Sequence, residues 1–143
     1  MVNLKTRTIR QEWTIPAKPK EVYDAFMDPV KHAVFTGDEA SGSSEVGKEF
    51  RAYGGYISAK NLELEPGKKI VQEWTTSEWP DGAHPSLLTI TLKRVEGGTK
   101  LTMVHSSVPA EQSDDYASGW KEHYWVKLEN YFKARKASKE KRV

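Results

Sequence analysis

The chain has 143 residues, no cysteine and a formal net charge of +2. Its length suits one domain with a sizeable core, and the lack of cysteine excludes disulfides, thiolate metal sites and cysteine nucleophiles. Residues 133–143 hold six Lys and Arg and one Glu, a net charge of +5, so residues 1–132 have a net charge of −3. An acidic body is not typical of nucleic-acid binding, and no apolar run reaches membrane-spanning length. We expect a cytoplasmic monomer that binds neither nucleic acid nor a membrane.

The first third of the chain predicts one strand and two short helices. Thr8–Ile15 alternates between apolar and polar residues, as a half-buried strand does. Pro19 suits the first position of a helix, and Asp28-Pro29 begins a second helix that runs to about Phe35. The residues expected to face the core from these two helices are Val22, Tyr23, Phe26, Val30, Ala33 and Val34.

Turn signals divide the middle of the chain into six predicted strands. Glycine pairs at 54–55 and 97–98 are typical of hairpins or bulges, and Pro66-Gly67 marks another turn. A loop at 77–85 is rich in strand-breaking residues and holds Trp79. The predicted strands are Glu39–Ser44, Glu49–Tyr53, Tyr56–Glu65, Lys69–Thr76, Ser86–Arg94 and Thr99–Val108.

Tyr116–Ala134 is expected to form one long amphipathic helix, capped by the stretch Ser113–Asp115. At the helical period, large side chains gather on one arc of about 140°. They are Trp120, Tyr124, Trp125, Leu128, Tyr131 and Phe132. This arc is either the core face of a packed helix or a face that also lines a pocket.

Strands joined in sequence by hairpin turns predict an antiparallel sheet, and helices at the two ends of the strand order indicate the α+β class. We expect a strongly curved sheet of about seven strands around the long helix. A sheet wrapped around a helix commonly leaves a cavity between them. The whole chain, 1–143, is predicted to be one domain, with a folded core at about 8–134 and a basic tail at 135–143.

The sequence contains no arrangement typical of catalysis or metal binding. Its four histidines lie on four different predicted elements, and only His105 falls on an inward strand face. A hydrogen-bonded core histidine is the favoured interpretation of His105, with a catalytic role as the alternative. Glu63 and Glu65 are expected to face water, and no phosphate-binding loop or nucleophile motif occurs. We therefore predict a binding module without catalytic residues, metal or cofactor.

Four stretches resemble one known family in their order and spacing. They are EVYDAFMDP at Glu21–Pro29, KIVQEWTTSEWP at Lys69–Pro80, TKLTMVHSSVP at Thr99–Pro109 and GWKEHYWVKLENYF at Gly119–Phe132. On these motifs the chain is similar to the activator of heat-shock protein 90 ATPase homologue 1-like family. That family belongs to the START-like, birch-pollen-allergen-like helix-grip superfamily. The resemblance covers about Thr8–Phe132 and implies a helix-grip fold with a cavity under the long helix.

The resemblance also implies a function. Eukaryotic co-chaperones of this family carry such a domain at their C-terminus, where it helps the chaperone's ATPase reach its closed state. A separate N-terminal domain makes their main contact with the chaperone, whereas many prokaryotic members are single domains. Thr75 stands where the family often has arginine, so a salt bridge made by that arginine is not expected here.

Three functions follow as hypotheses. The first is a non-enzymatic module that contacts a heat-shock protein 90-type chaperone. The second is a carrier or sensor of a small lipophilic ligand, and the third is an enzyme such as a cyclase or hydrolase. An apolar cavity favours a neutral, flat molecule over phosphate, sugar or metal. The residues expected to line it are Phe26, Phe35, Phe50, Tyr56, Trp74, Leu88, Ile90, Met103, His105, Trp120 and Tyr124.

Overall fold

The computed structural model describes residues 5–141, and side chains as far as residue 136. The strands in this part of the chain are β1 (Thr6–Ile15), β2 (Ser41–Gly42), β3 (Glu49–Ala52), β4 (Ile57–Glu65), β5 (Lys69–Thr76), β6 (Ser86–Val95) and β7 (Gly98–Pro109). Two short helices, α1 (Pro19–Met27) and α2 (Pro29–Thr36), follow β1. The C-terminal helix is a continuous run of α3 (Ser113–Trp120), the π turn η3 (Lys121–Trp125) and α4 (Val126–Lys141). Short 3-10 turns are η1 (Tyr53–Gly55) and η2 (Ala110–Gln112).

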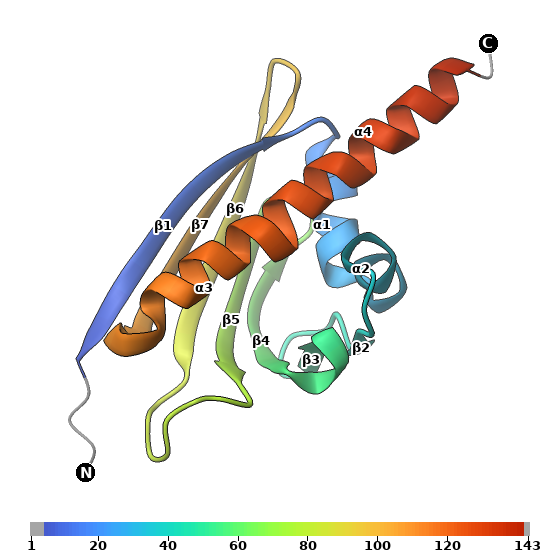
Figure 1. The fold of residues 1–143 in the computed structure, drawn as a ribbon. Coiled ribbons are helices and arrows are strands. Elements are labelled where there is room, and N and C mark those ends of the chain that lie inside the picture. The colour runs from blue at the N-terminus through green and yellow to red at the C-terminus, as the bar shows by residue number, and fades with distance from the viewer. Residues whose placement is uncertain (1–4, 142–143) are drawn as a thin grey trace.

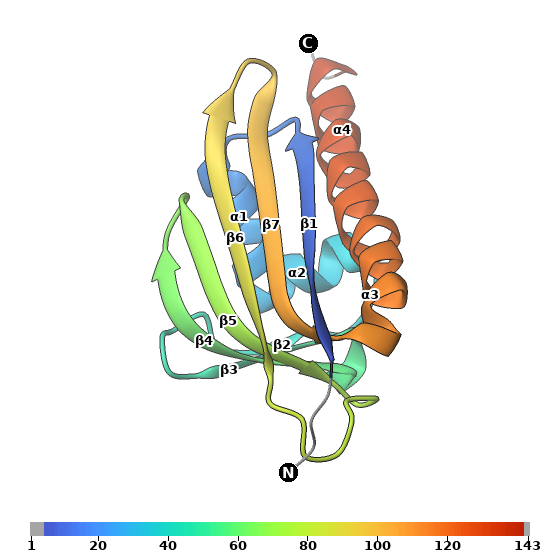
Figure 2. The ribbon, with the colours of Figure 1, turned by 90° about the vertical axis from the view of Figure 1, so that its left-hand side faces the viewer.

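The strands form one seven-stranded antiparallel sheet in the order β1-β7-β6-β5-β4-β3-β2. The sheet curves around the C-terminal helix, and α1 and α2 lie on the same side of the sheet as that helix (Figures 1 and 2). This arrangement confirms the predicted α+β class and the helix-grip architecture. Among the described residues, no helix is long and apolar enough to cross a membrane.

Asp28 separates the two short helices because it serves both of them. Its backbone N–H donates to the Asp24 carbonyl at 2.8 Å and so ends α1. Its carboxylate accepts hydrogen bonds from the N–H groups of Val30, at 2.8 Å, and Lys31, at 3.2 Å, and so caps α2. Pro29 takes the first position of α2, where a missing N–H has no cost.

The prediction for the inward face of α2 was wrong. Val30 and Val34 are 74% and 60% exposed, whereas His32 and Phe35 are buried. The buried histidine reverses the expected face because both of its ring nitrogens find partners in the core, a compensation that a pattern of apolar residues does not reveal. On α1 the predicted residues are buried as expected, namely Val22, Tyr23 and Phe26.

The C-terminal helix contains a π turn that the sequence pattern did not predict. Within it the Val126 N–H donates to the Lys121 carbonyl, five residues back instead of four. In an uninterrupted α-helix, side chains five residues apart point about 140° away from each other. The wider π turn brings Trp120 and Trp125 onto one side, where their rings stack at 5.2 Å with planes 10° apart. The predicted large side chains of the arc are buried, apart from Tyr131, which is half-buried.

The predicted start and end of this helix need two corrections. Ser113–Asp115 forms the first turn and provides no capping side chain, because the Ser113 hydroxyl donates to the Ala110 carbonyl at 3.0 Å instead. Asp114 and Asp115 do place negative charge in the first turn, where it interacts favourably with the helix dipole. At the other end the backbone stays helical to Lys141, past the predicted end at Ala134. The side chains after residue 136 lie outside the described residues.

Indole N–H groups fix the long helix against the first strand. Trp125 donates to the Gln11 side-chain oxygen at 2.8 Å, and the Gln11 amide nitrogen donates to the Ala117 carbonyl at 2.9 Å. Trp13 on β1 donates to Glu129 at 2.7 Å. These bonds tie the helix to β1 at three points along its length.

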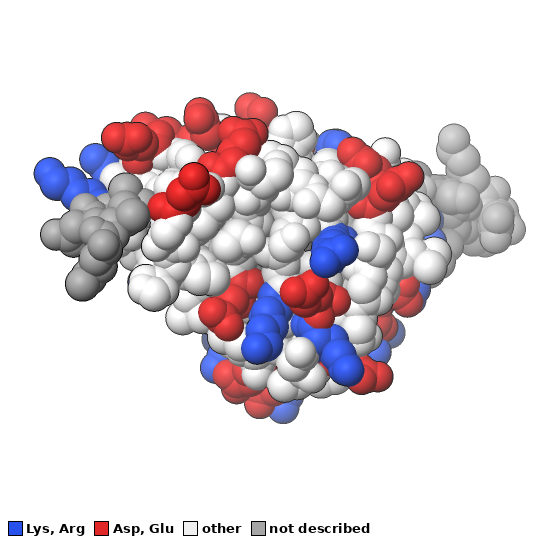
Figure 3. All heavy atoms as spheres, turned by 90° about the horizontal axis from the view of Figure 1, so that it is seen from below, with Lys and Arg blue, Asp and Glu red and all other residues white. Residues whose placement is uncertain are grey.

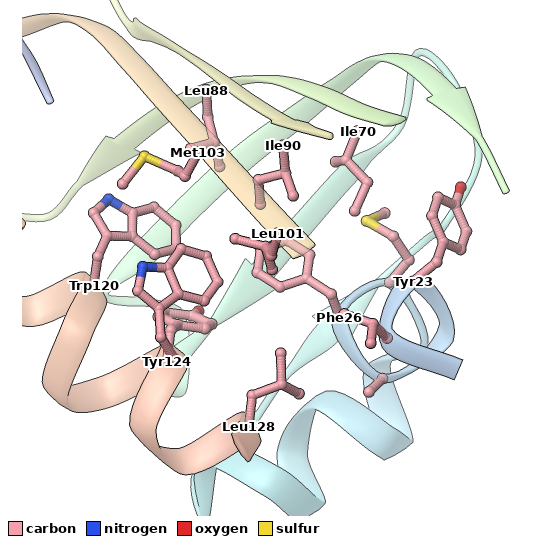
Figure 4. Packing of buried hydrophobic residues seen from close by; sticks show 14 of the residues in the cluster. Tyr23, Phe26, Ile70, Leu88, Ile90, Leu101, Met103, Trp120, Tyr124 and Leu128 are labelled. Atoms are coloured by element: carbon pink, nitrogen blue, oxygen red, sulfur yellow. The ribbon is translucent and has the colours of Figure 1, made fainter. Parts of the chain in front are cut away.

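The space beneath the middle of the long helix is filled by side chains (Figure 4). Leu88 and Met103 approach Trp120 from the sheet, and Phe26 on α1 and Leu101 on β7 fill the region toward Leu128. All six of these side chains are at most 5% exposed. The expected cavity under the centre of the helix is therefore occupied by packed core.

Trp120→Ala should lower the free energy of unfolding by about 3–5 kcal/mol, the range for deleting a large aromatic side chain from a core. Trp120 is 3% exposed and contacts the rings of Trp74, Tyr124 and Trp125. Chemical denaturation monitored by circular dichroism measures the change. Trp79→Ala is the control, because Trp79 is only half-buried in its loop, and it should cost clearly less. An unchanged midpoint for Trp120→Ala would contradict the assignment of Trp120 to the core.

Candidate functional site

A half-open pocket of about 280 Å³ lies at one end of the molecule, between the first part of the C-terminal helix and the ends of β4 and β5. Its surface is almost entirely apolar. The residues that line it are Tyr53, Tyr56, Ile57, Trp74, Tyr116, Gly119, Trp120, His123 and Tyr124. Figure 3 views this end of the molecule and shows a band of uncharged side chains with acidic side chains gathered along one edge.

Four of the eleven predicted lining residues line this pocket, namely Tyr56, Trp74, Trp120 and Tyr124. The other seven belong to the packed interior and do not reach it. They are Phe26, Phe35, Phe50, Leu88, Ile90, Met103 and His105. Strand alternation, the helical arc and aromatic character predicted correctly that these side chains point inward, but they did not predict that the side chains fill the space they share.

Sequence reasoning missed five lining residues, namely Tyr53, Ile57, Tyr116, Gly119 and His123. A signal for three of them was present, because Tyr116, Gly119 and His123 are spaced around Trp120 as neighbours on one helix face. Tyr53 and Ile57 flank the glycine pair at 54–55, where η1 turns the chain toward the helix. Gly54 takes a left-handed conformation, with φ of 66°, that favours glycine in this turn.

A directed chain of hydrogen bonds lies in the core behind the pocket. The Trp120 indole N–H donates to His105 Nδ1 at 3.0 Å, and an indole nitrogen can only donate. His105 therefore carries its proton on Nε2 and donates to Ser86 Oγ at 2.7 Å. The Ser86 hydroxyl donates in turn to the Trp74 carbonyl at 2.7 Å. The chain joins two pocket-lining tryptophans, one on the helix and one on the sheet.

His105 is a structural residue of the core. It is fully buried, both of its ring nitrogens are engaged, and burial lowers its pKa to about 3. It therefore stays neutral and is not free to exchange protons with a bound molecule. This confirms the interpretation of His105 as a hydrogen-bonded core histidine.

His32, like His105, is a hydrogen-bonded histidine of the core, and it contacts Tyr124. Its Nδ1 donates to the Phe26 carbonyl at 2.7 Å, so its Nε2 accepts from the Tyr124 hydroxyl at 2.9 Å. Burial lowers the pKa of His32 to about 4, although the bond to the Phe26 carbonyl opposes the shift. The bond to His32 holds Tyr124 in place at the pocket.

The tyrosine hydroxyls at the pocket mouth are also engaged. The Tyr53 hydroxyl donates to the His123 carbonyl, in the π turn, at 2.5 Å. The Tyr116 hydroxyl donates to Gln112 at 2.7 Å and accepts from Thr76 at 2.7 Å. Burial is the main cause that raises the pKa of both tyrosines to about 12, so their hydroxyls stay protonated. Tyr53 thus connects η1 to the helix across the pocket.

The loop between β5 and β6 packs along the pocket's edge. The Trp79 indole N–H donates to the His84 carbonyl at 3.0 Å, and its ring meets Trp74 edge-on at 6.1 Å. Gln112, just before α3, donates to the Glu78 carbonyl at 3.0 Å. Thr75 precedes this loop, and its hydroxyl faces the Ser58 carbonyl at 3.5 Å.

The chemistry of the pocket is that of an apolar binding site. Among the described residues, every buried side-chain nitrogen and oxygen has a hydrogen-bond partner, and no three acidic or histidine side chains gather as metal ligands. Glu63 and Glu65 are exposed, as predicted.

A second hollow of about 670 Å³ lies between the β6–β7 turn and α4. Exposed charged side chains such as Lys18 and Arg94 line it. The aromatic pocket is therefore the better candidate for a specific site.

The fold and this pocket define a helix-grip domain with an apolar site beside its long helix. The chain belongs to the Activator of Hsp90 ATPase homolog 1-like family, whose profile matches residues 16–133. It is 31% identical over 129 residues to the Activator of 90 kDa heat shock protein ATPase homolog of Dictyostelium discoideum, covering 89% of this chain and 33% of that protein. The human Activator of 90 kDa heat shock protein ATPase homolog 1 is 28% identical over 131 residues, covering 92% and 38%. The chain thus spans about a third of these curated relatives.

Solved structures show the same fold. An HSP90 activator from Plasmodium falciparum superposes with a TM-score of 0.76 at 24% identity, covering 89% of this chain and 95% of that chain. The Aha1 dimer from Colwellia psychrerythraea superposes with a TM-score of 0.74 at 19% identity, covering 87% and 94%. At these identities the likeness concerns the fold alone.

Stability should fall on mild acidification, because the pKa values of His105 and His32 are about 3 and about 4 in the folded chain against 6.5 for an unperturbed histidine. Below pH 6.5 the unfolded chain binds protons that the folded chain does not, so stability decreases as pH falls toward the folded pKa values. The test is urea unfolding at about pH 7.5 and about pH 5. Both pH values lie above the range in which most carboxylates titrate, so the histidines dominate the difference. The amide of His105→Gln can still accept from Trp120 and donate to Ser86. This variant should therefore lose roughly half as much unfolding free energy between the two pH values as the wild type does.

The control is His84→Gln, an exposed histidine whose replacement should leave the difference between the two pH values unchanged. A wild-type chain with equal stability at both pH values would contradict the assignment of His105 and His32 as neutral core residues.

Proposed function

We propose that this domain is a non-enzymatic partner of a heat-shock protein 90-type chaperone and raises the chaperone's ATPase rate through protein contact. The family match over residues 16–133 carries this proposal, supported by the names of the curated relatives. The pocket chemistry is consistent with it, since the described polar groups of the core are already engaged with one another. The proposal includes a monomer acting in the cytoplasm, in keeping with the cysteine-free sequence.

Adding the purified domain to the purified chaperone from the same organism should increase the rate of ATP hydrolysis in a saturable way. The increase is expected because a partner that binds the ATPase-competent state better than other states shifts the population toward it. A coupled ATPase assay measures the rate, and biolayer interferometry measures binding. A chaperone variant unable to hydrolyse ATP is the control for contaminating activity. The absence of binding at up to about 100 µM would contradict the proposal.

A second candidate function, a carrier or sensor of a small apolar molecule, is favoured by one observation. The pocket is aromatic, nearly free of polar surface and accessible from solvent. Its volume of about 280 Å³ is at the lower limit of small-molecule sites, which occupy about 300–1,000 Å³. A neutral one- or two-ring compound matches this lining better than a long-chain lipid does.

A neutral fluorescent probe such as N-phenyl-1-naphthylamine should bind saturably with a micromolar Kd if this second function is correct. Gly119 lines the pocket, and a Cβ added there meets no atom closer than His123 Cδ2 at 3.9 Å. Gly119→Leu should therefore fill the pocket and weaken probe binding by about tenfold or more, since buried anchors of this size are worth that much. Gly119→Ala is the matched control, with most of the space retained. Equal binding to Gly119→Leu would exclude the pocket as the probe's site.

A further inference from the structure

Carboxylates lie near the aromatic pocket, on its tyrosines and along one margin of its helix. The charges of Asp38 and Glu78 act on the pocket tyrosines Tyr53 and Tyr116, where they add to the effect of burial in raising the pKa of each hydroxyl. Asp115 and Glu122 lie four residues before and three residues after Gly119, on the same side of the helix. We call Asp38, Glu78, Asp115 and Glu122 the acidic rim.

The acidic rim is free to meet positive charge from outside. All four of its carboxylates belong to exposed residues, and none forms an ion pair with the described part of the chain. Two lysines lie on the same helix. Lys121 is exposed, and the Lys127 amine lies 5.7 Å from the centre of the Tyr53 ring and already donates to the Thr36 carbonyl at 2.9 Å. The acidic edge beside the uncharged band in Figure 3 shows the same combination of charge and apolar surface.

This combination distinguishes between possible occupants of the pocket. The carboxylates would repel a fatty acid or another anionic lipid, and they would add little to the binding of a neutral compound. They would attract lysine and arginine, whose charges can reach the acidic rim while a neighbouring side chain enters the pocket. Interfaces between proteins commonly combine such a buried apolar anchor with a polar rim.

We propose that the pocket binds an apolar or aromatic side chain presented by a short basic segment of a partner protein. The proposal rests on the function by protein contact proposed above and names the surface that makes the contact. The anchor side chain packs among Trp74, Trp120 and Tyr124. Hydrogen bonds to His105 and His32 already hold the side chains of Trp120 and Tyr124. Little ordering of the site is then needed on binding, which favours affinity.

Defined peptides test the proposal without a chaperone. The probe is the hexapeptide Lys-Lys-Phe-Leu-Lys-Lys, capped at both ends, and the controls are Glu-Glu-Phe-Leu-Glu-Glu and Lys-Lys-Ser-Ser-Lys-Lys. Only the first should bind saturably, as measured by the fluorescence of the pocket tryptophans and by amide shifts of Gly119 and His123 in NMR. Its affinity should fall with added salt, because the charges at the rim are exposed. Equal binding of all three peptides, or of none, would overturn the proposal.

Two pairs of variants separate the apolar and the charged contributions. Gly119→Leu should weaken binding of the basic peptide by about tenfold or more relative to Gly119→Ala. Glu78→Lys/Glu122→Lys should weaken it severalfold at low salt and little at high salt. The matched control is Glu65→Lys/Glu96→Lys, which reverses two exposed charges at the opposite end of the sheet. Circular dichroism melts verify that each variant is folded.

The outcome for this site is distinguishable from the outcome for the proposed function. If the chaperone binds the wild type and Gly119→Leu equally, the chaperone contact stands and the pocket is not its site. If the basic peptide binds but the chaperone does not, the pocket recognises a different protein. If N-phenyl-1-naphthylamine binds and none of the peptides does, the pocket is a small-molecule site and the proposal fails.

Discussion

The hydrogen-bond chain from Trp120 through His105 and Ser86 to the Trp74 carbonyl sets the position of the long helix on the sheet. Apolar packing alone allows a helix to rotate or slide, since the hydrophobic effect has no direction. The chain begins at a group that can only donate, the Trp120 indole, and ends at one that can only accept, the Trp74 carbonyl, so its direction is fixed. Moving the helix would leave a polar atom unpaired in the core. The aromatic pocket exists where this chain holds Trp74 and Trp120 apart from η1.

The π turn is the second constraint on the pocket, and it acts through side-chain direction. It turns Trp125 toward β1, where its indole N–H reaches Gln11, and still leaves Tyr124 facing the pocket. Two adjacent large aromatics can then both be buried on one helix. The π turn also presents the His123 carbonyl to the Tyr53 hydroxyl, which connects the helix with the turn after β3. A π turn within an otherwise regular helix is often found at functional sites, and here it borders the candidate site.

The filled interior restricts what the domain can bind. A helix-grip fold with small side chains under the helix would enclose a central cavity, whereas here Met103, Leu88 and Phe26 occupy that volume. The remaining space is at the end of the molecule, where it is accessible to a protein as well as to a small compound. An apolar site at the surface with carboxylates beside it is better suited to recognition of another chain than to storage of a lipid.

The sequence by itself determined the order of the elements, the α+β class and the inward faces of β5, β6, β7 and the long helix, because strand and helix periods are local properties of the chain. It also determined the family, through motifs that surround Trp74, Trp79 and Trp120. Only the tertiary structure decided which inward residues fill the core and which border a pocket, since this depends on how opposing side chains share one volume. The burial of His32, which exposes Val30, and the π turn were likewise decided there. His32 bonds to Tyr124, and Trp125 and the His123 carbonyl in the π turn bond to Gln11 and Tyr53, all partners far away in the sequence.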